Sequence, residues 1–131
     1  MPTPSKPKVL IVDDLVSLRK TLSQVLKVYD LTIASSFEEA VSIIEANDFV
    51  VAILDIRLEY ENVWNVDGLY LLKQLKAKNP NCGVIIFTGH RDSIWEESLS
   101  SYNHVRVIDK DETVNIENVR DIVKEFVNLA Q

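Results

Sequence analysis

Five short apolar runs alternate with amphipathic segments, and this alternation constrains the fold more than any other feature of the chain. The central run, 50–55, reads Val-Val-Ala-Ile-Leu-Asp: an almost unbroken apolar stretch closed by a carboxylate. A run of this length and composition is typical of a strand buried on both faces, the usual state of parallel strands. The other four predicted strands are 8–14, 31–34, 83–88 and 105–110.

The segments between the strands carry apolar residues at helical spacing. The first, 15–28, places Leu15, Leu18, Leu22, Val25 and Leu26 on one face and Arg19, Lys20 and Lys27 on the other. Capping residues predict where the next two begin: Ser36 opens a helix that ends near 47–48, and Asp67 opens one that ends in Lys76 and Lys78. A shorter polar helix is expected over about 93–101, and a last helix over about 114–129.

Regular alternation of strand and helix predicts right-handed crossovers and a parallel sheet with helices on both faces. The expected fold is therefore α/β: a flavodoxin-like, doubly wound (βα)5 sandwich with a five-stranded parallel sheet in the order 2-1-3-4-5. At 131 residues the chain has the length of one domain. We expect residues 1–7, which include three prolines, to be a flexible leader, and residues 8–131 to form the domain.

Composition narrows the function. A net charge of −6 argues against a broad nucleic-acid surface, which needs a basic patch. The lone Cys82 cannot form an intramolecular disulfide, and no apolar run approaches the roughly 18–20 residues of a membrane span. Together with the absence of a signal peptide, these features predict a cytoplasmic protein that binds neither nucleic acid nor membrane.

Polar residues close four of the strands. All strand carboxyl ends of a parallel sheet lie at one edge, where ligands bind at the point at which the winding reverses. For the order 2-1-3-4-5 that point separates the first and third strands, so Asp13, Asp14 and Asp55 should crowd together, with Thr88 and Lys110 at the same edge. Crowded carboxylates repel one another, and binding a cation relieves the repulsion.

This arrangement suits Mg²⁺ and phosphoryl transfer. Asp55 is the candidate nucleophile, which would form an aspartyl phosphate. Asp13, Asp14 and Asp55 would hold the metal, together with the backbone carbonyl of Arg57. Lys110 would pair with one phosphoryl oxygen and the Thr88 hydroxyl would donate to another.

Each residue also has an ordinary explanation. Asp13 and Asp14 are compatible with a helix cap and a solvated neighbour, and Thr88 with a turn residue. Lys110 is compatible with a surface lysine or a structural partner of Asp55. Their joint position at one edge favours function.

The chain resembles the response-regulator receiver domain of two-component signalling over nearly its whole length. The matching residues are 9–14 with their acidic pair, Asp55 after 51–54, 67–69 opening the third helix, 88–90, and Lys110. The resemblance implies transfer of phosphate from the phosphohistidine of a histidine kinase, or from a phosphotransfer protein, to Asp55, with slow self-catalysed hydrolysis and no other enzymatic activity. It also implies that Thr88, Lys110 and the face of the fourth helix, fifth strand and fifth helix switch on phosphorylation, and that this face can serve a homodimer or an output domain.

The sequence departs from the family pattern at several positions. The connection 56–66 is long for a strand-to-helix loop, where about 2–6 residues is usual. Glu59 and Asp111 stand where prolines are common, and Val107 where many members carry a switch aromatic. We hypothesise that Tyr60 and Trp64 form a lid or partner contact, and that Trp95 and Tyr102 contact a partner on the output side.

Three other functions are weaker. A receiver-like scaffold that works without phosphorylation does not need the complete set of Asp13, Asp14, Asp55, Thr88 and Lys110. A phosphatase resembling haloacid dehalogenases calls for an Asp two residues after the nucleophile, where this chain has Arg57. A nucleotide-binding domain needs a glycine-rich phosphate loop after the first strand, and none is present.

Overall fold

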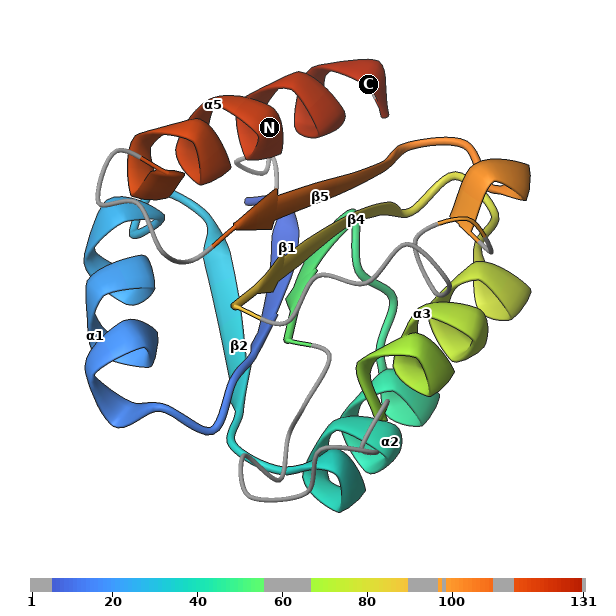
Figure 1. Cartoon of the computed structure of the whole chain (residues 1–131), viewed down its shortest axis with the longest axis horizontal. Coiled ribbons are helices and arrows are strands. Elements are labelled where there is room, and N and C mark those ends of the chain that lie inside the picture. The colour runs from blue at the N-terminus through green and yellow to red at the C-terminus, as the bar shows by residue number, and fades with distance from the viewer. Residues whose placement is uncertain (1–5, 56–66, 90–96, 98, 110–114, 131) are drawn as a thin grey trace, which may run out of the picture.

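A computed structural model describes residues 6–55, 67–89, 97, 99–109 and 115–130. Strands and helices alternate through these residues (Figure 1). The strands are β1 (Lys8–Val12), β2 (Asp30–Ala34), β3 (Val51–Leu54), β4 (Gly83–Thr88) and β5 (Val105–Asp109). The helices are α1 (Val16–Val25), α2 (Phe37–Ala46), α3 (Asp67–Lys78), the short 3₁₀ helix η1 (Leu99–Ser101) and α5 (Asn115–Leu129).

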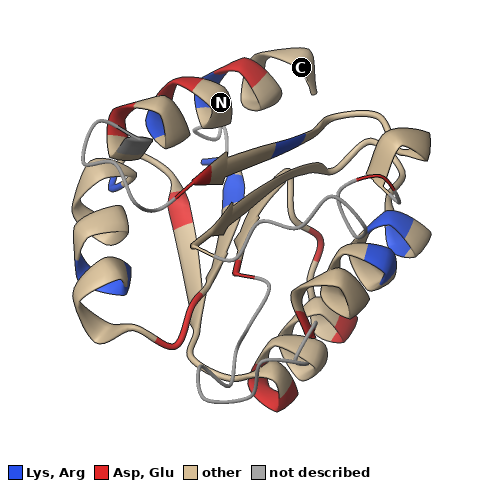
Figure 2. Ribbon diagram, in the orientation of Figure 1, with Lys and Arg blue, Asp and Glu red and all other residues tan. Residues whose placement is uncertain are grey.

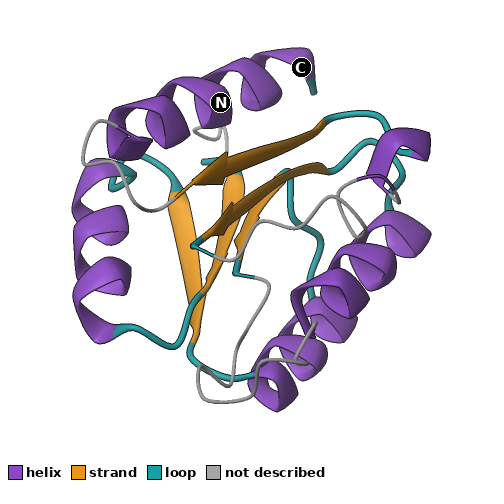
Figure 3. Ribbon diagram, viewed as in Figure 1, coloured by secondary structure: helices purple, strands orange, loops and turns teal. Residues whose placement is uncertain are grey.

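The five strands form one parallel sheet in the order β2-β1-β3-β4-β5. Helices α1 and α5 cover one face, and α2 and α3 cover the other (Figure 3). The predicted fold class, a flavodoxin-like doubly wound sandwich in the order 2-1-3-4-5, is confirmed. The strand order places β1 and β3 side by side, with the winding reversing between them.

Alternation along the central strands divides the core into two layers. Odd-numbered residues, such as Ile11 and Ile53, pack against α1 and α5, while even-numbered residues, such as Leu10 and Leu54, pack against α2 and α3. Because both faces are covered, β3 and β4 are buried along their whole length. This explains why their sequences are continuous apolar runs.

Gly83 is required at the start of β4 by close packing. A Cβ built on this residue would lie 2.5 Å from Cγ of Phe126, on α5. The absence of a side chain therefore lets the end of α5 approach the sheet directly.

The start of α1 differs from the prediction. The helix begins at Val16, and Leu15 precedes it in an extended conformation with a side chain that is 40% exposed. The carboxylate of Asp13 accepts a hydrogen bond from the Leu15 amide, which holds Leu15 in the turn before the helix rather than on its buried face. Arg19, which we placed on the solvent face, is half-buried.

Capping predictions were partly correct. Ser36 caps α2, since its hydroxyl accepts the Glu39 amide at 3.2 Å. Asp67 is the first residue of α3 rather than the residue before it, so its carboxylate lies in the first turn of the helix. Both positions place an acidic or polar oxygen where a helix has free amides.

Several predictions fall outside the described residues. They concern the leader up to residue 5, Glu59, Tyr60 and Trp64 in 56–66, most of the polar helix 93–101 with Trp95, and Asp111. Tyr102 is described: it is half-buried and packs against the core layer under α2 and α3. Among the described helices, none has the length and apolar character needed to cross a bilayer.

Candidate functional site

Asp13 and Asp55 each follow a strand at the same level of the sheet. The last paired residues of β1 and β3 are Val12 and Leu54, and the two aspartates come directly after them. Backbone hydrogen bonds extend the ladder to both: the Asp55 amide donates to the Val12 carbonyl at 3.1 Å, and the Asp13 amide donates to the Ala34 carbonyl at 3.2 Å. Figure 2 shows acidic residues at the carboxyl ends of both strands. The sheet itself therefore positions this pair.

Asp14 joins the pair to form a compact acidic cluster. One carboxylate oxygen from each of Asp13, Asp14 and Asp55 lies within 4.8 Å of the others. Asp13 and Asp55 are each only 2% exposed, so solvent screens their charges poorly. Carboxylates this close repel one another when all are ionised, and a bound cation stabilises the ionised set.

Asp13 has a structural role in this cluster. Its Oδ1 atom accepts the Leu15 amide at 2.9 Å, which satisfies a backbone donor just before α1. Asp13 is not the cap of α1, because the residue at the N-cap is Leu15, which makes no side-chain cap bond, so the helix-cap interpretation is wrong in that respect. The bond from the Leu15 amide is compatible with metal binding because a carboxylate has several lone pairs.

Asp14 does not behave as a solvated neighbour. Its Oδ1 atom is buried and has no hydrogen-bond partner among the described residues. A buried oxygen without a partner is costly unless a ligand satisfies it. The donor set, three carboxylates at one sheet edge, fits a hard cation such as Mg²⁺, which binds oxygen ligands and retains several waters.

The other predicted site residues are placed less completely. Thr88 is the last residue of β4, is fully buried, and pairs in register with Asp109 at the end of β5. It therefore lies at the same sheet edge as the acidic cluster. Arg57 and Lys110 lie outside the described residues. In the sequence, Arg57 comes two positions after Asp55, and Lys110 directly follows Asp109.

Sequence reasoning missed one residue at this edge. The Nη1 atom of Arg19 donates to the backbone carbonyl of Asp13 at 2.8 Å. A sequence signal existed: an arginine in the second turn of a helix can fold back toward the strand end that precedes it. The amphipathic pattern alone assigned Arg19 to solvent because it stands beside Lys20.

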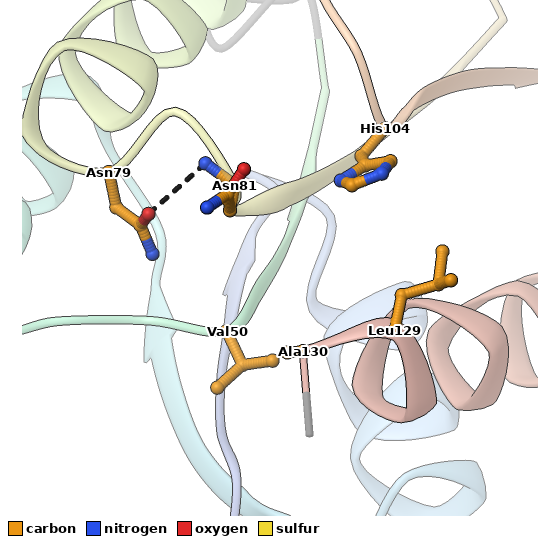
Figure 4. Close-up of a pocket in the computed structure, with 6 residues that line it drawn as sticks. All are labelled: Val50, Asn79, Asn81, His104, Leu129 and Ala130. Carbon is orange, nitrogen blue, oxygen red and sulfur yellow. Dashed lines mark hydrogen bonds between the residues drawn. The ribbon is translucent and has the colours of Figure 1, made fainter.

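The described residues also line a pocket of about 450 Å³ at the opposite, amino-terminal edge of the sheet (Figure 4). Its lining combines asparagine amides and an imidazole with apolar side chains: Val50, Asn79, Asn81, His104, Leu129 and Ala130. In this pocket the side-chain oxygen Oδ1 of Asn79 accepts a hydrogen bond from the backbone amide of Asn81 at 3.1 Å. Of the predicted site residues that the structure describes, none lines this pocket.

The fold and site together define a flavodoxin-like sandwich with an acidic cluster at the switch point of its sheet. The family model of the response regulator receiver domain matches residues 9–124, and the chain belongs to this family. It is a receiver domain of the kind found in two-component response regulators. Receiver domains are signalling domains that bind Mg²⁺ at an acidic pocket, and Asp13, Asp14 and Asp55 form an acidic cluster in this chain.

Individual relatives agree with this assignment. The chain is 29% identical to Sporulation initiation phosphotransferase F of Bacillus subtilis, over 93% of this chain and 94% of that protein. It is 34% identical to the C4-dicarboxylate transport transcriptional regulatory protein DctD of Rhizobium meliloti, over 66% of this chain but only 18% of that protein. A solved CheY-like receiver domain from Methanospirillum hungatei matches with a TM-score of 0.79 and 25% identity, covering 95% of each chain.

The chain covers 18% of DctD and 19% of the DNA-binding transcriptional regulator NtrC of Escherichia coli. It therefore spans about a fifth of the length of each of these two relatives.

Proposed function

We propose that this chain is a phospho-accepting receiver domain that takes a phosphoryl group onto Asp55 and switches its output surface in response. The observation that carries the proposal is the acidic cluster, in which oxygens of Asp13, Asp14 and Asp55 lie within 4.8 Å of one another at a sheet edge. The donor would be the phosphohistidine of a histidine kinase or of a phosphotransfer protein.

The Asp55 carboxylate is the nucleophile in this proposal. One of its oxygens forms a bond to phosphorus while the bond from phosphorus to the donor imidazole nitrogen breaks, and the imidazole keeps the electron pair. Hydrolysis reverses the modification: a water oxygen attacks phosphorus, inorganic phosphate leaves, and the carboxylate returns. We propose that this chain catalyses only these two reactions on itself, the hydrolysis slowly. The ladder bond from the Asp55 amide to Val12 holds the nucleophile in place for both.

Asp13, Asp14 and Asp55 would hold Mg²⁺ with the backbone carbonyl of Arg57. When bound, Mg²⁺ neutralises negative charge on the phosphoryl oxygens. The buried Oδ1 atom of Asp14 supports this, because a bound cation or its water gives that atom a partner, which no described residue provides.

Thr88 and Lys110 would contact the remaining phosphoryl oxygens, the first with its hydroxyl and the second with its ammonium group. Thr88 is buried at the end of β4 and pairs with Asp109 of β5. A change in the position of Thr88 is therefore transmitted to β5. We propose that the face formed by the fourth helix, β5 and α5 binds an output domain or a second copy of the chain.

The relatives support a role in phosphotransfer. The relative that the chain matches over almost its full length is named a phosphotransferase. DctD and NtrC, of which it covers 18% and 19%, are transcriptional regulators, so an attached or separate output partner is part of the proposal.

The decisive test is the intact mass after incubation with acetyl phosphate, with and without Mg²⁺. We expect one phosphoryl group to add only when Mg²⁺ is present. Asp55→Asn should remove the adduct, whereas Asp30→Asn should keep it. Asp30 is a matched control because it is an exposed aspartate at the opposite end of a strand.

Absence of an adduct in the unmodified chain would contradict the proposal. If beryllofluoride with Mg²⁺ then also failed to raise the melting temperature, the phosphorylation-independent scaffold would replace it. An adduct that persists in Asp55→Asn would instead place the acceptor at another residue.

A further inference from the structure

Arg19 reaches from α1 back to the turn that carries the acidic pair. Its guanidinium Nη1 atom donates to the carbonyl oxygen of Asp13 at 2.8 Å, across six positions of sequence. The side chain is half-buried, unlike that of Lys20 beside it, which is exposed. The interaction is therefore partly shielded from bulk water.

Three hydrogen bonds close a ring around the turn. The Asp13 carboxylate accepts the Leu15 amide at 2.9 Å, the Leu15 carbonyl accepts the Arg19 amide at 3.1 Å, and the Arg19 side chain returns to the Asp13 carbonyl. Asp14 lies within this ring, and its own buried Oδ1 atom has no partner among the described residues. The backbone of Asp14 is thus held on both sides while its carboxylate is left for a ligand.

We propose that Arg19 is a positioning residue for the metal site: it fixes the 13–15 turn so that the carboxylates of Asp13 and Asp14 stay directed at the cation beside Asp55. The inference rests on the metal site of the proposed function, and it assigns Arg19 no contact with metal or phosphate. Partners that orient metal ligands commonly affect affinity about 10- to 100-fold.

Charge and geometry act in opposite directions here, which makes the proposal testable. Removing a positive charge near three carboxylates favours a bound cation, because one competing cation is gone. Removing the hydrogen bond frees the turn and weakens the site. A guanidinium that acted only through its charge would therefore give tighter Mg²⁺ binding when lost, whereas a positioning residue gives weaker binding.

The experiment is calorimetric titration of the protein with MgCl₂, for the unmodified chain and for Arg19→Met, Arg19→Lys and Lys20→Met. Lys20→Met is the matched control: it removes the same charge from the adjacent, exposed position. We expect Arg19→Met to weaken Mg²⁺ binding about tenfold. Arg19→Lys, which keeps a charged donor, should recover most of the affinity, and Lys20→Met should leave it unchanged or slightly tighter.

Thermal melts in EDTA check that each variant is folded. If Arg19→Met does not fold, Arg19→Gln, which also removes the charge and shortens the side chain, takes its place. Its Mg²⁺ affinity is then judged by the same criterion. Affinity in the Arg19 variant that equals or exceeds that of Lys20→Met overturns the proposal, as does a folded unmodified chain that binds no Mg²⁺.

Phosphorylation by acetyl phosphate separates this inference from the proposed function. If Arg19 positions the metal ligands, Arg19→Met raises the Mg²⁺ concentration for half-maximal adduct formation, while the rate at saturating Mg²⁺ stays near that of the unmodified chain. An unmodified chain that binds Mg²⁺ but accepts no phosphate would refute the proposed function and leave calorimetry to decide the role of Arg19.

Discussion

The two edges of the sheet treat buried charge in opposite ways. At the carboxyl edge, Asp13, Asp14 and Asp55 bring like charges together, and Asp14 Oδ1 is buried without a partner among the described residues. At the amino edge, Lys76 is only 6% exposed, yet its ammonium group donates three hydrogen bonds. The acceptors are the carbonyls of Pro80, Cys82 and Asn103, at 3.1, 2.5 and 2.6 Å.

A second lysine repeats the pattern at the amino edge. The ammonium group of Lys78, on α3, donates to the carbonyls of Ile44, Glu45 and Asn47 at 2.8, 3.1 and 2.6 Å. These carbonyls lie at the end of α2, where a helix has unsatisfied acceptors and a partial negative charge. Lys78 therefore caps a neighbouring helix and ties α2 to α3.

The comparison separates stability from function. The amino edge satisfies its buried donors internally and needs no ligand, so changes there should cost folding free energy. The carboxyl edge keeps three mutually repelling carboxylates, one of which has a buried oxygen with no partner in the described part of the chain. Neutralising a carboxylate there should therefore stabilise the metal-free chain and remove its response to Mg²⁺.

The largest effect is expected at Lys76. Lys76→Met removes the ammonium group and leaves three carbonyls near the chain interior without their donor, so the free energy of unfolding should fall by about 3 kcal/mol. Urea denaturation measures this free energy of unfolding. Lys73→Met, an exposed position on the same helix, is the control and should change stability little. Equal stability of the two variants would show that the amino edge does not depend on this lysine.

A pH effect of intermediate size follows from Cys82, beside Lys76. Burial raises the pKa of the Cys82 thiol from 9.0 to about 11, and the nearby Lys76 ammonium only partly offsets this. Because the folded pKa is above the unfolded one, the stabilisation is fully present below pH 9 and is lost as pH rises toward 11. Its size is on the order of 2 kcal/mol.

The measurement for Cys82 is the free energy of unfolding from pH 8 to 11, beside Cys82→Ala. Burial also lowers the pKa of Lys76 from 10.5, which acts in the opposite direction, so stability from that group rises with pH. Both proteins contain Lys76, so their difference reports the thiol together with its interaction with Lys76. The unmodified chain should lose more stability with rising pH than Cys82→Ala, and parallel curves would contradict the assignment.

At the carboxyl edge the expected change in stability has the opposite sign. Asp14→Asn removes one of three crowded negative charges, so the metal-free chain should gain about 1 kcal/mol of stability. The same change should abolish the rise in melting temperature on adding Mg²⁺. Thermal melts in EDTA and in MgCl₂ test both, with Asp30→Asn as the control. A loss of stability in EDTA would show that Asp14 is a structural residue.

The smallest effect is expected at Lys78, which is more exposed than Lys76. Lys78→Met should cost about 0.5 kcal/mol, because water can replace the ammonium group at exposed carbonyls. The ion pair with Asp48, at 3.6 Å and largely exposed, should contribute almost nothing. A salt titration checks this: the difference between Lys78→Met and the unmodified chain should be nearly the same at low and high salt if the carbonyls dominate.

Local pattern was sufficient for the strands and most helices. The predicted run 83–88 coincides with β4, the predicted run 105–110 contains β5, which ends at Asp109, and the Ser36 cap is where the sequence predicts it. The close approach of Asp13, Asp14 and Asp55 also followed from sequence, because the strand order and the position of each carboxylate after its strand leave few arrangements. Periodicity was insufficient at Leu15, where a hydrogen bond from the Leu15 amide to the Asp13 carboxylate overrides the apolar pattern.

What the sequence by itself determined is therefore the alternation of elements, the sheet order it implies and the meeting of three carboxylates at one edge. Tertiary structure alone decided which cations are structural. Arg19, Lys76 and Lys78 look alike in sequence, as basic residues on amphipathic helices, and their acceptors belong to the Asp13 turn, the start of β4 and β5, and the end of α2. Long flexible side chains reach backbone groups that adjoin them only after the helices pack, and no local pattern records such distances.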